Sequence, residues 1–125
     1  MTASVTYEGF LRCKAVHNQS NTTIETDAPT DNRGKGERFS PTDLVCTALG
    51  TCIITTMAIK ATDLGIELAG TTVDVQKHMS TDAPRRIIQI DANVHIPLTQ
   101  LDEKEKTILE RIGDNCPVAK SLHPD

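Results

Sequence analysis

The sequence predicts an α+β fold in which antiparallel sheets pack around a central buried helix. Three observations lead to this class: the candidate strands group as antiparallel hairpins, one long apolar segment at 41–63 separates two such groups, and no strand–helix–strand alternation supports a parallel sheet. The predicted order is βββ-α-ββ-α-α. A chain of 125 residues suits one compact domain, so we expect a single domain over residues 1–125.

The N-terminal part has the pattern of short strands. Residues 3–17 alternate loosely between apolar and polar side chains and predict a hairpin with its turn near Glu8-Gly9. Residues 22–27 predict a third strand. The stretch 27–36 (DAPTDNRGKG) is rich in Pro, Asn, Asp and Gly, which predicts a loop.

Residues 41–63 carry the clearest helix signal. Ser40 suits the N-cap position and Pro41 the first helical position. Asp43 then falls where a carboxylate closes a capping-box-like bond and meets the positive end of the helix. The segment LVCTALGTCIITTMAIKA that follows is almost entirely apolar or small. A helix that is apolar all round is expected to be buried.

The C-terminal part predicts two strands and two helices. Residues 70–79 and 86–96 have strand character, and residues 101–112 form an amphipathic helix that we expect to stop at Gly113. A last short helix is expected to begin near Cys116.

Composition argues against several classes of protein. The net charge of −4 and the 2% aromatic content disfavour nucleic-acid binding, which needs clustered cations and stacking rings. No apolar run is expected to approach the roughly 20 residues of a membrane span. The N-terminus lacks a basic segment followed by an apolar stretch, so no secretory signal is expected and a cytoplasmic location is predicted.

Four cysteines, at positions 13, 46, 52 and 116, are the candidates for chemistry. In a cytoplasmic chain they should be reduced thiols, and the absence of a C-x-x-C motif weakens both a metal site and a thioredoxin-like site. Cys46 and Cys52 are six residues apart on one helix, a rise of about 9 Å. Since a disulfide needs Cα atoms within about 7 Å, any functional pair must join one of them to Cys13 or Cys116.

The residues alone leave the reactive thiol open. Cys52 lies mid-helix among apolar residues, where a small buried hydrophobe is the simpler interpretation and a reactive thiol needs a cationic neighbour. Cys116 precedes Pro117 at a predicted helix start, and helix N-termini lower thiol pKa values. Local electrostatics therefore favour Cys116 as the thiolate.

The segment FSPTDLVCTALGTCIITTM, followed some sixty residues later by NCPVAKSL, resembles the OsmC/Ohr family. In that family a central helix begins with Ser/Asn-Pro-x-Glu-Leu and carries one cysteine, and a second cysteine opens a Cys-Pro-Val segment. The resemblance implies an OsmC-like fold and an intertwined homodimer with the site at its interface. It implies a peroxidatic Cys52 and a resolving Cys116, an organic hydroperoxide as substrate, and no cofactor other than an external dithiol reductant such as a lipoylated protein.

The resemblance also implies an arginine that activates Cys52 and a carboxylate that positions it. Arg12 and Arg38 both lie where family members place the arginine, and Arg12 is favoured; either could instead be an exposed surface residue. Thr42 stands at the Ohr-type glutamate position, and the neighbouring Asp43 is shorter than the usual Glu. Asp43 is nine residues, about 13 Å, from Cys52, so it could act only across a dimer, or serve only as a cap.

Two other functions stay open at this point. The first is an OsmC-fold binding protein for a small apolar ligand, with vestigial thiols. The second is a dimer with only a structural role.

Overall fold

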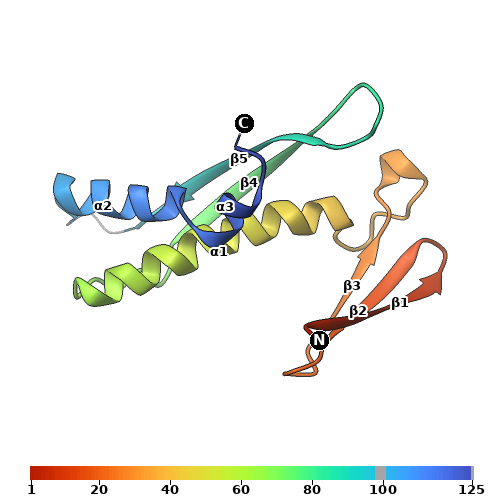
Figure 1. Cartoon of the computed structure of the whole chain (residues 1–125), viewed down its shortest axis with the longest axis horizontal. Coiled ribbons are helices and arrows are strands. Elements are labelled where there is room, and N and C mark those ends of the chain that lie inside the picture. The colour runs from red at the N-terminus through yellow and green to blue at the C-terminus, as the bar shows by residue number, and fades with distance from the viewer. Residues whose placement is uncertain (98–100, 125) are drawn as a thin grey trace. The chain divides into compact units, whose positions relative to one another are not determined.

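The computed structural model describes residues 1–97 and 101–124 and has the mixed α+β architecture that the sequence predicts (Figure 1). The elements along the chain are β1 (Ala3–Gly9), β2 (Arg12–His17), β3 (Thr23–Asp27), a short 3₁₀ helix η1 (Thr30–Asn32), α1 (Pro41–Asp63), β4 (Thr72–Met79), β5 (Ile87–His95), α2 (Glu103–Asp114) and α3 (Pro117–Ser121). The chain forms two compact units, Met1–Val45 and Cys46–Asp125, described in turn. The single domain and the dimer stay predictions.

The N-terminal unit is a three-stranded antiparallel sheet in the order β1-β2-β3. The turn between β1 and β2 contains Gly9, Phe10 and Leu11, all with positive φ, so the reversal lies slightly after the predicted Glu8-Gly9. In the register of the second hairpin, Arg12 of β2 lies opposite Asp27 of β3. This pairing sets up the ionic contact described below.

The loop after β3 folds back tightly on itself. The N–H groups of Gly34 and Gly36 donate to the carbonyl oxygens of Pro29 and Ala28. A Cβ at Gly34 would fall 1.6 Å from the carbonyl oxygen of Ala28, so only glycine fits there. The predicted loop is confirmed, with η1 as a short addition within it.

Helix α1 begins where the sequence predicts. The Ser40 hydroxyl accepts from the Asp43 N–H at 3.0 Å, and the Asp43 carboxylate accepts from the Ser40 N–H at 3.0 Å. These reciprocal bonds close a capping box, with Asp43 in the position usually taken by Glu or Gln. Asp43 therefore has the capping role expected of it.

The burial of α1 differs from the prediction for an all-apolar helix. Its buried residues are Cys46, Gly50, Met57 and Ala61, whose spacing places them on one stripe. Ile59, on the other side, is 67% exposed. Burial all round was therefore wrong for the single chain, because the fully buried residues of α1 lie on one stripe and Ile59 is exposed.

The length of α1 also corrects the expectation about apolar runs. By length and composition Pro41–Asp63 could cross a membrane. The same is true of the core helix of many soluble proteins, so this property alone assigns no location. The buried stripe described above is the feature that a core helix requires.

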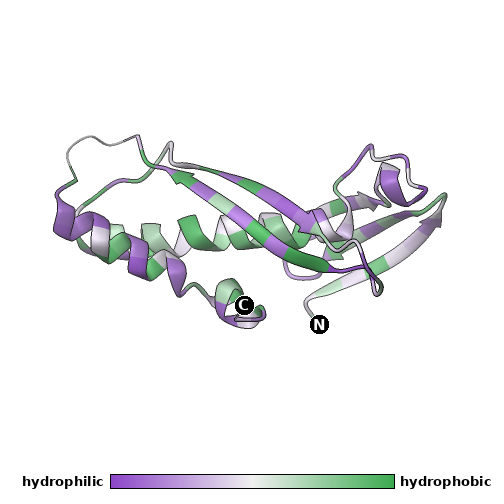
Figure 2. Cartoon of the chain, turned by 90° about the horizontal axis from the view of Figure 1, so that it is seen from above, coloured by the Kyte–Doolittle hydropathy of each residue, from purple (hydrophilic) through white to green (hydrophobic). Residues whose placement is uncertain are grey.

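In the C-terminal unit, α1 packs against the β4-β5 hairpin and α2. A Cβ at Gly50 would lie 3.1 Å from the side chains of Val73 and Val75, which shows how closely α1 approaches β4. Figure 2 shows apolar and polar residues alternating along these two strands, as a half-buried hairpin requires. The core of the unit is Met57, Ala61, Leu68 and Leu109.

Helix α2 runs through the glycine that was expected to end it. It begins after Asp102, which forms a capping box with Glu105, and continues to Asp114. Gly113 is buried, and a Cβ there would lie 3.2 Å from atoms of Ile53 and Met57. The glycine therefore permits close packing of α2 on α1 and does not terminate the helix.

Candidate active site

Cys52 lies partly buried in the middle of α1 and contacts the start of α3. The backbone N–H of Val118 donates to Cys52 Sγ at 3.5 Å, across 66 residues of sequence. Thr56, one turn further along α1, places its hydroxyl oxygen 3.8 Å from the same sulfur. The Cys116 side chain lies close enough to lower the pKa of Cys52. The two cysteines that the resemblance pairs are thus brought together.

Cys116 is the N-cap of α3, as its position before Pro117 predicts. Its sulfur accepts from the Ala119 N–H at 3.4 Å, and the residue is 0% exposed. Both cysteines are reduced in this structure. The short helix therefore directs two consecutive N–H groups at two different sulfurs, that of Ala119 at Cys116 and that of Val118 at Cys52.

The environment lowers the pKa of the Cys52 thiol. The Val118 N–H is the largest cause, and the Cys116 thiol and the Thr56 hydroxyl act in the same direction. Burial opposes them by disfavouring the charged form, without reversing the outcome. Cys52 is thus the thiol that ionises more readily than usual.

The pKa of Cys116 is raised, and this corrects the expectation drawn from local sequence. Burial is the largest cause, and the neighbouring Cys52 adds to it, while the Ala119 and Val118 N–H groups lower the pKa by less. The start of a helix does lower the pKa of a nearby thiol, but here the thiol with the lowered pKa is that of Cys52. The sequence does not show that Cys52 approaches Val118.

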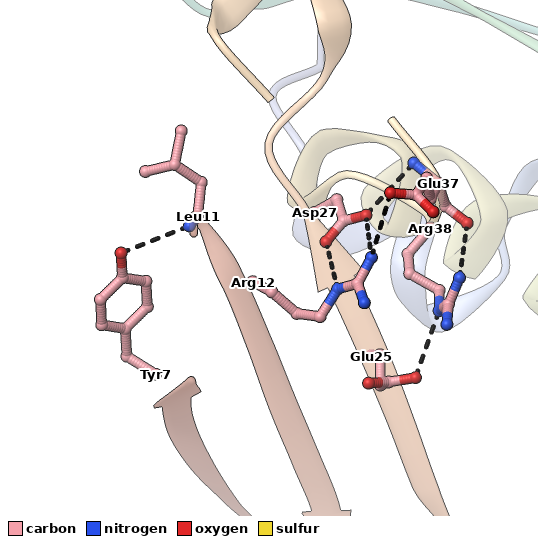
Figure 3. Close-up of polar contacts among 7 residues, drawn as sticks. All are labelled: Tyr7, Leu11, Arg12, Glu25, Asp27, Glu37 and Arg38. Carbon is pink, nitrogen blue, oxygen red and sulfur yellow. Dashed lines mark hydrogen bonds and ion pairs between the residues drawn. The ribbon is translucent and has the colours of Figure 1, made fainter. Parts of the chain in front are cut away.

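In the N-terminal unit, Arg12 is held by a buried carboxylate (Figure 3). Its Nε donates to Asp27 Oδ1 at 2.7 Å and its Nη2 to Oδ2 at 2.8 Å, a bidentate pair. Asp27 is 2% exposed and also accepts from the Glu37 N–H at 3.2 Å. The guanidinium lowers the pKa of Asp27, and this carboxylate raises the pKa of Arg12.

Arg38 has a looser partner on the same strand. Its Nε donates to Glu25 at 3.2 Å and its Nη1 to the Glu37 carbonyl oxygen at 3.0 Å, both at the surface (Figure 3). Both arginines therefore bind carboxylates of β3. Of the two, Arg12 has the more rigid setting, because its partner is buried.

Asp27, Glu25, Glu37, Thr56 and Val118 were not among the residues singled out from sequence. Asp27 could have been found, because the predicted hairpin places the end of the third strand beside the start of the second. Thr56 could also have been found by its spacing of four from Cys52. Val118 belongs to the Cys-Pro-Val segment that carries the resemblance, but it acts through its backbone N–H, and the sequence does not show its contact with Cys52. The action of either arginine on Cys52 stays a prediction.

No metal site is formed within residues 1–97 and 101–124, where no group of three or more His, Cys, Asp or Glu side chains is placed to hold an ion.

The chain therefore belongs to a class of two-thiol proteins with a mixed α+β fold. One cysteine lies in the long helix, and the second lies close to it at the start of a short C-terminal helix. Comparison with known proteins gives that class its family. Residues 34–125 match the family described as OsmC-like protein. The chain belongs to this family.

Solved structures agree with the assignment. A proposed osmotic stress induced and detoxification response protein from Psychrobacter arcticus 273-4 is 50% identical, with a TM-score of 0.95, and the match covers 100% of this chain and 90% of that one. An organic hydroperoxide resistance protein OsmC from Legionella pneumophila is 15% identical with a TM-score of 0.74, covering 98% and 90% of the two chains. An organic hydroperoxide resistance protein from Elizabethkingia anophelis is 15% identical with a TM-score of 0.73, covering 97% and 87%.

At such low identity the last two show a shared fold only. Among curated proteins, none matches the chain significantly.

Proposed function

We propose that this protein is a thiol peroxidase that reduces organic hydroperoxides through Cys52 and Cys116. The observation that carries the proposal is the geometry of two thiols at one helix start: the Val118 N–H of α3 donates to Cys52 Sγ at 3.5 Å, and Cys116, the N-cap of the same helix, is buried. The lowered pKa of Cys52 and the raised pKa of Cys116 agree with this arrangement. A peroxidatic cysteine must be a thiolate, and a resolving cysteine must lie within reach of it.

The reaction follows from these two states. The Cys52 thiolate attacks the outer oxygen of the hydroperoxide, the O–O bond breaks, and the alkoxide takes up a proton and leaves as an alcohol. Cys52 is then a sulfenic acid. The sulfur of Cys116 displaces its hydroxyl group, which leaves with the Cys116 proton as water, and a disulfide forms. An external dithiol, such as the lipoyl group of a partner protein, returns both thiols to the reduced state.

The arginine of the site is proposed to be Arg12. Its bidentate contact with the buried Asp27 fixes the guanidinium, and a fixed cation stabilises an anion better than a mobile one. Asp43 would support the site across a dimer interface, in addition to its capping role. A cytoplasmic location fits a protein that works with reduced cysteines.

The proposed assembly is a homodimer. Val5 and Tyr7 on β1 share one face of the sheet with Ile24 on β3, as their cross-strand register shows, and they are 67%, 63% and 48% exposed. Three exposed large side chains on one face are what a partner surface would cover. A second copy of the chain is the partner that the family resemblance implies.

The experiment is a peroxidase assay with cumene or tert-butyl hydroperoxide and a dithiol. We expect Cys52→Ser to abolish peroxide consumption and Cys116→Ser to stop turnover after the first equivalent. Cys13→Ser, in the other unit, is the matched control and should keep wild-type turnover. Peroxide consumption by Cys52→Ser at the wild-type rate would refute the proposal. Peroxide inertness together with a co-purifying apolar molecule would instead support the ligand-binding function.

A further inference from the structure

Thr56 is the one side chain of α1 that the structure describes as bonding to the sulfur of Cys52. It lies four residues after Cys52, and residues with this spacing are neighbours on a helix surface. Its Oγ1 lies 3.8 Å from Cys52 Sγ, within the range for a hydrogen bond to sulfur. Thr56 is half-buried, so its hydroxyl is partly withdrawn from water.

Other helical threonines use their hydroxyl groups differently. Thr51, Thr62 and Thr107 each donate to a backbone carbonyl three or four residues earlier, at 2.8 to 3.0 Å. This is the usual bond of a threonine inside a helix. Among the described residues, Thr56 instead has Cys52 Sγ as its hydrogen-bond partner. Its hydroxyl is therefore available to the thiol.

The direction of this hydrogen bond is fixed once the thiol ionises. A thiolate has no proton to donate, so the Thr56 hydroxyl must be the donor. It joins the Val118 N–H, which donates to the same sulfur at 3.5 Å. Cys116, the N-cap of α3, is the titratable group that shifts the pKa of Cys52, and within the described residues no charged side chain contributes to that pKa shift.

We propose that Thr56 is a catalytic residue of this site, whose hydroxyl donates a hydrogen bond to the Cys52 thiolate that attacks the peroxide. The proposal rests on the function proposed above, and it adds a residue that contacts the reacting sulfur. The hydroxyl raises the fraction of Cys52 that is ionised near neutral pH.

A donor of this kind has two opposing effects on rate. It increases the thiolate fraction at pH values below the pKa, and it makes each thiolate a weaker nucleophile, because nucleophilicity falls with a Brønsted coefficient of about 0.4–0.5. Below the pKa of the thiol, the larger thiolate fraction outweighs the weaker nucleophilicity. Above that pKa the thiol is already ionised, so only the weaker nucleophilicity remains. Removing the hydroxyl should therefore lower the reaction rate of Cys52 at low pH and raise that rate at high pH.

The test compares Thr56→Val with wild type in the full-length reduced protein. Val keeps the branched shape and removes the hydroxyl. The rate of iodoacetamide alkylation at Cys52 is measured by peptide mass spectrometry from about pH 5 to 10. This range of ~5 units brackets the pKa of the thiol. We expect the midpoint to rise by about 0.5 to 1 unit, with a rate about two- to threefold lower below the midpoint and a higher plateau above it.

Three variants complete the design. Thr56→Ser restores the hydroxyl and should restore the wild-type profile. Thr55→Val removes an exposed hydroxyl from the adjacent position of α1 and should leave the profile unchanged. Thr56→Ala replaces Thr56→Val if the latter does not fold. Coincident profiles for wild type and the hydroxyl-free variant would overturn the proposal, as would a Thr56→Ser profile that matches that variant.

This measurement and the peroxidase assay can fail separately. If alkylation behaves as expected but no hydroperoxide is consumed, Thr56 acidifies Cys52 in a protein with another function. If hydroperoxide is consumed but Thr56→Val leaves the alkylation profile unchanged, the peroxidase stands and the role of Thr56 does not.

Discussion

The Arg12–Asp27 pair is the contact of single residues with the clearest pH dependence. Because Arg12 lowers the pKa of Asp27 in the folded protein, the pair stabilises the fold when the carboxylate is ionised. That contribution is fully present at pH values above the ordinary Asp value of about 3.9. It is lost as pH falls through the lower, folded-state pKa.

Asp27→Asn should therefore lower the melting temperature at pH 7, because it removes the buried, bidentate partner of the half-buried Arg12 and leaves that guanidinium with the exposed Glu37 at 3.9 Å. The difference from wild type should shrink as pH falls below about 4 and through the lower folded-state pKa of Asp27, where folded wild type also loses the charge. Glu25→Gln, which removes the exposed partner of Arg38, is the control and should change the melting temperature little. A pH-independent effect of Asp27→Asn would contradict this account.

The cysteines show where residue-level reasoning from sequence stops. The position of Cys116 at a helix start could be predicted from Pro117, and it is correct. The acidity of its thiol was predicted wrongly, because acidity depends on burial and on which sulfur each N–H reaches. The Val118 N–H bonds to Cys52, 66 residues away along the chain, and that depends on tertiary packing alone.

At the level of elements, local signals fixed the helix starts well. Helix α1 has the predicted bounds because Ser40, Pro41 and Asp43 form its start. The strands predicted in the C-terminal part agree with β4 and β5 to within two residues. Gly113 was misread as a stop signal, since a glycine that permits close packing and a glycine that ends a helix look alike in sequence.

The capping box at the start of α2 should stabilise the protein measurably. The Asp102 carboxylate accepts a hydrogen bond from the Glu105 N–H at 2.7 Å, and the Glu105 carboxylate accepts one from the Asp102 N–H at 3.1 Å. Asp102→Ala should lower the free energy of unfolding by about 1 kcal/mol, measured by urea denaturation. Lys104→Ala, an exposed change in the same turn, should have less than half that effect. Equal effects of the two substitutions would show that the capping box contributes nothing of its own.

At the scale of the whole molecule, α1 was expected to be buried all round, but its fully buried residues form a single stripe in the chain alone. The sequence could indicate that the helix is apolar, but not which surface covers each side of it. The exposed Val5 and Tyr7 face of the N-terminal sheet raises the same question of what covers it. The proposed homodimer answers it.

Light scattering should therefore give a mass twice the 13.6 kDa of the chain. Tyr7→Glu places a charge on the proposed interface and should shift the protein toward monomer. Thr6→Glu, the adjacent residue on the opposite face of β1, is the matched control and should remain dimeric. A wild-type protein that is monomeric at high micromolar concentration would contradict the assembly.

The central claim is that Cys52 and Cys116 form one redox pair. The most direct measurement is peptide mass spectrometry of the fully reduced protein after one equivalent of cumene hydroperoxide, with no reductant present. The account predicts a disulfide-linked peptide that joins Cys52 to Cys116, its loss on adding a dithiol, and unmodified Cys13 and Cys46. A protein whose Cys52 remains a thiol, or is oxidised to a sulfinic acid without linkage to Cys116, would contradict the account.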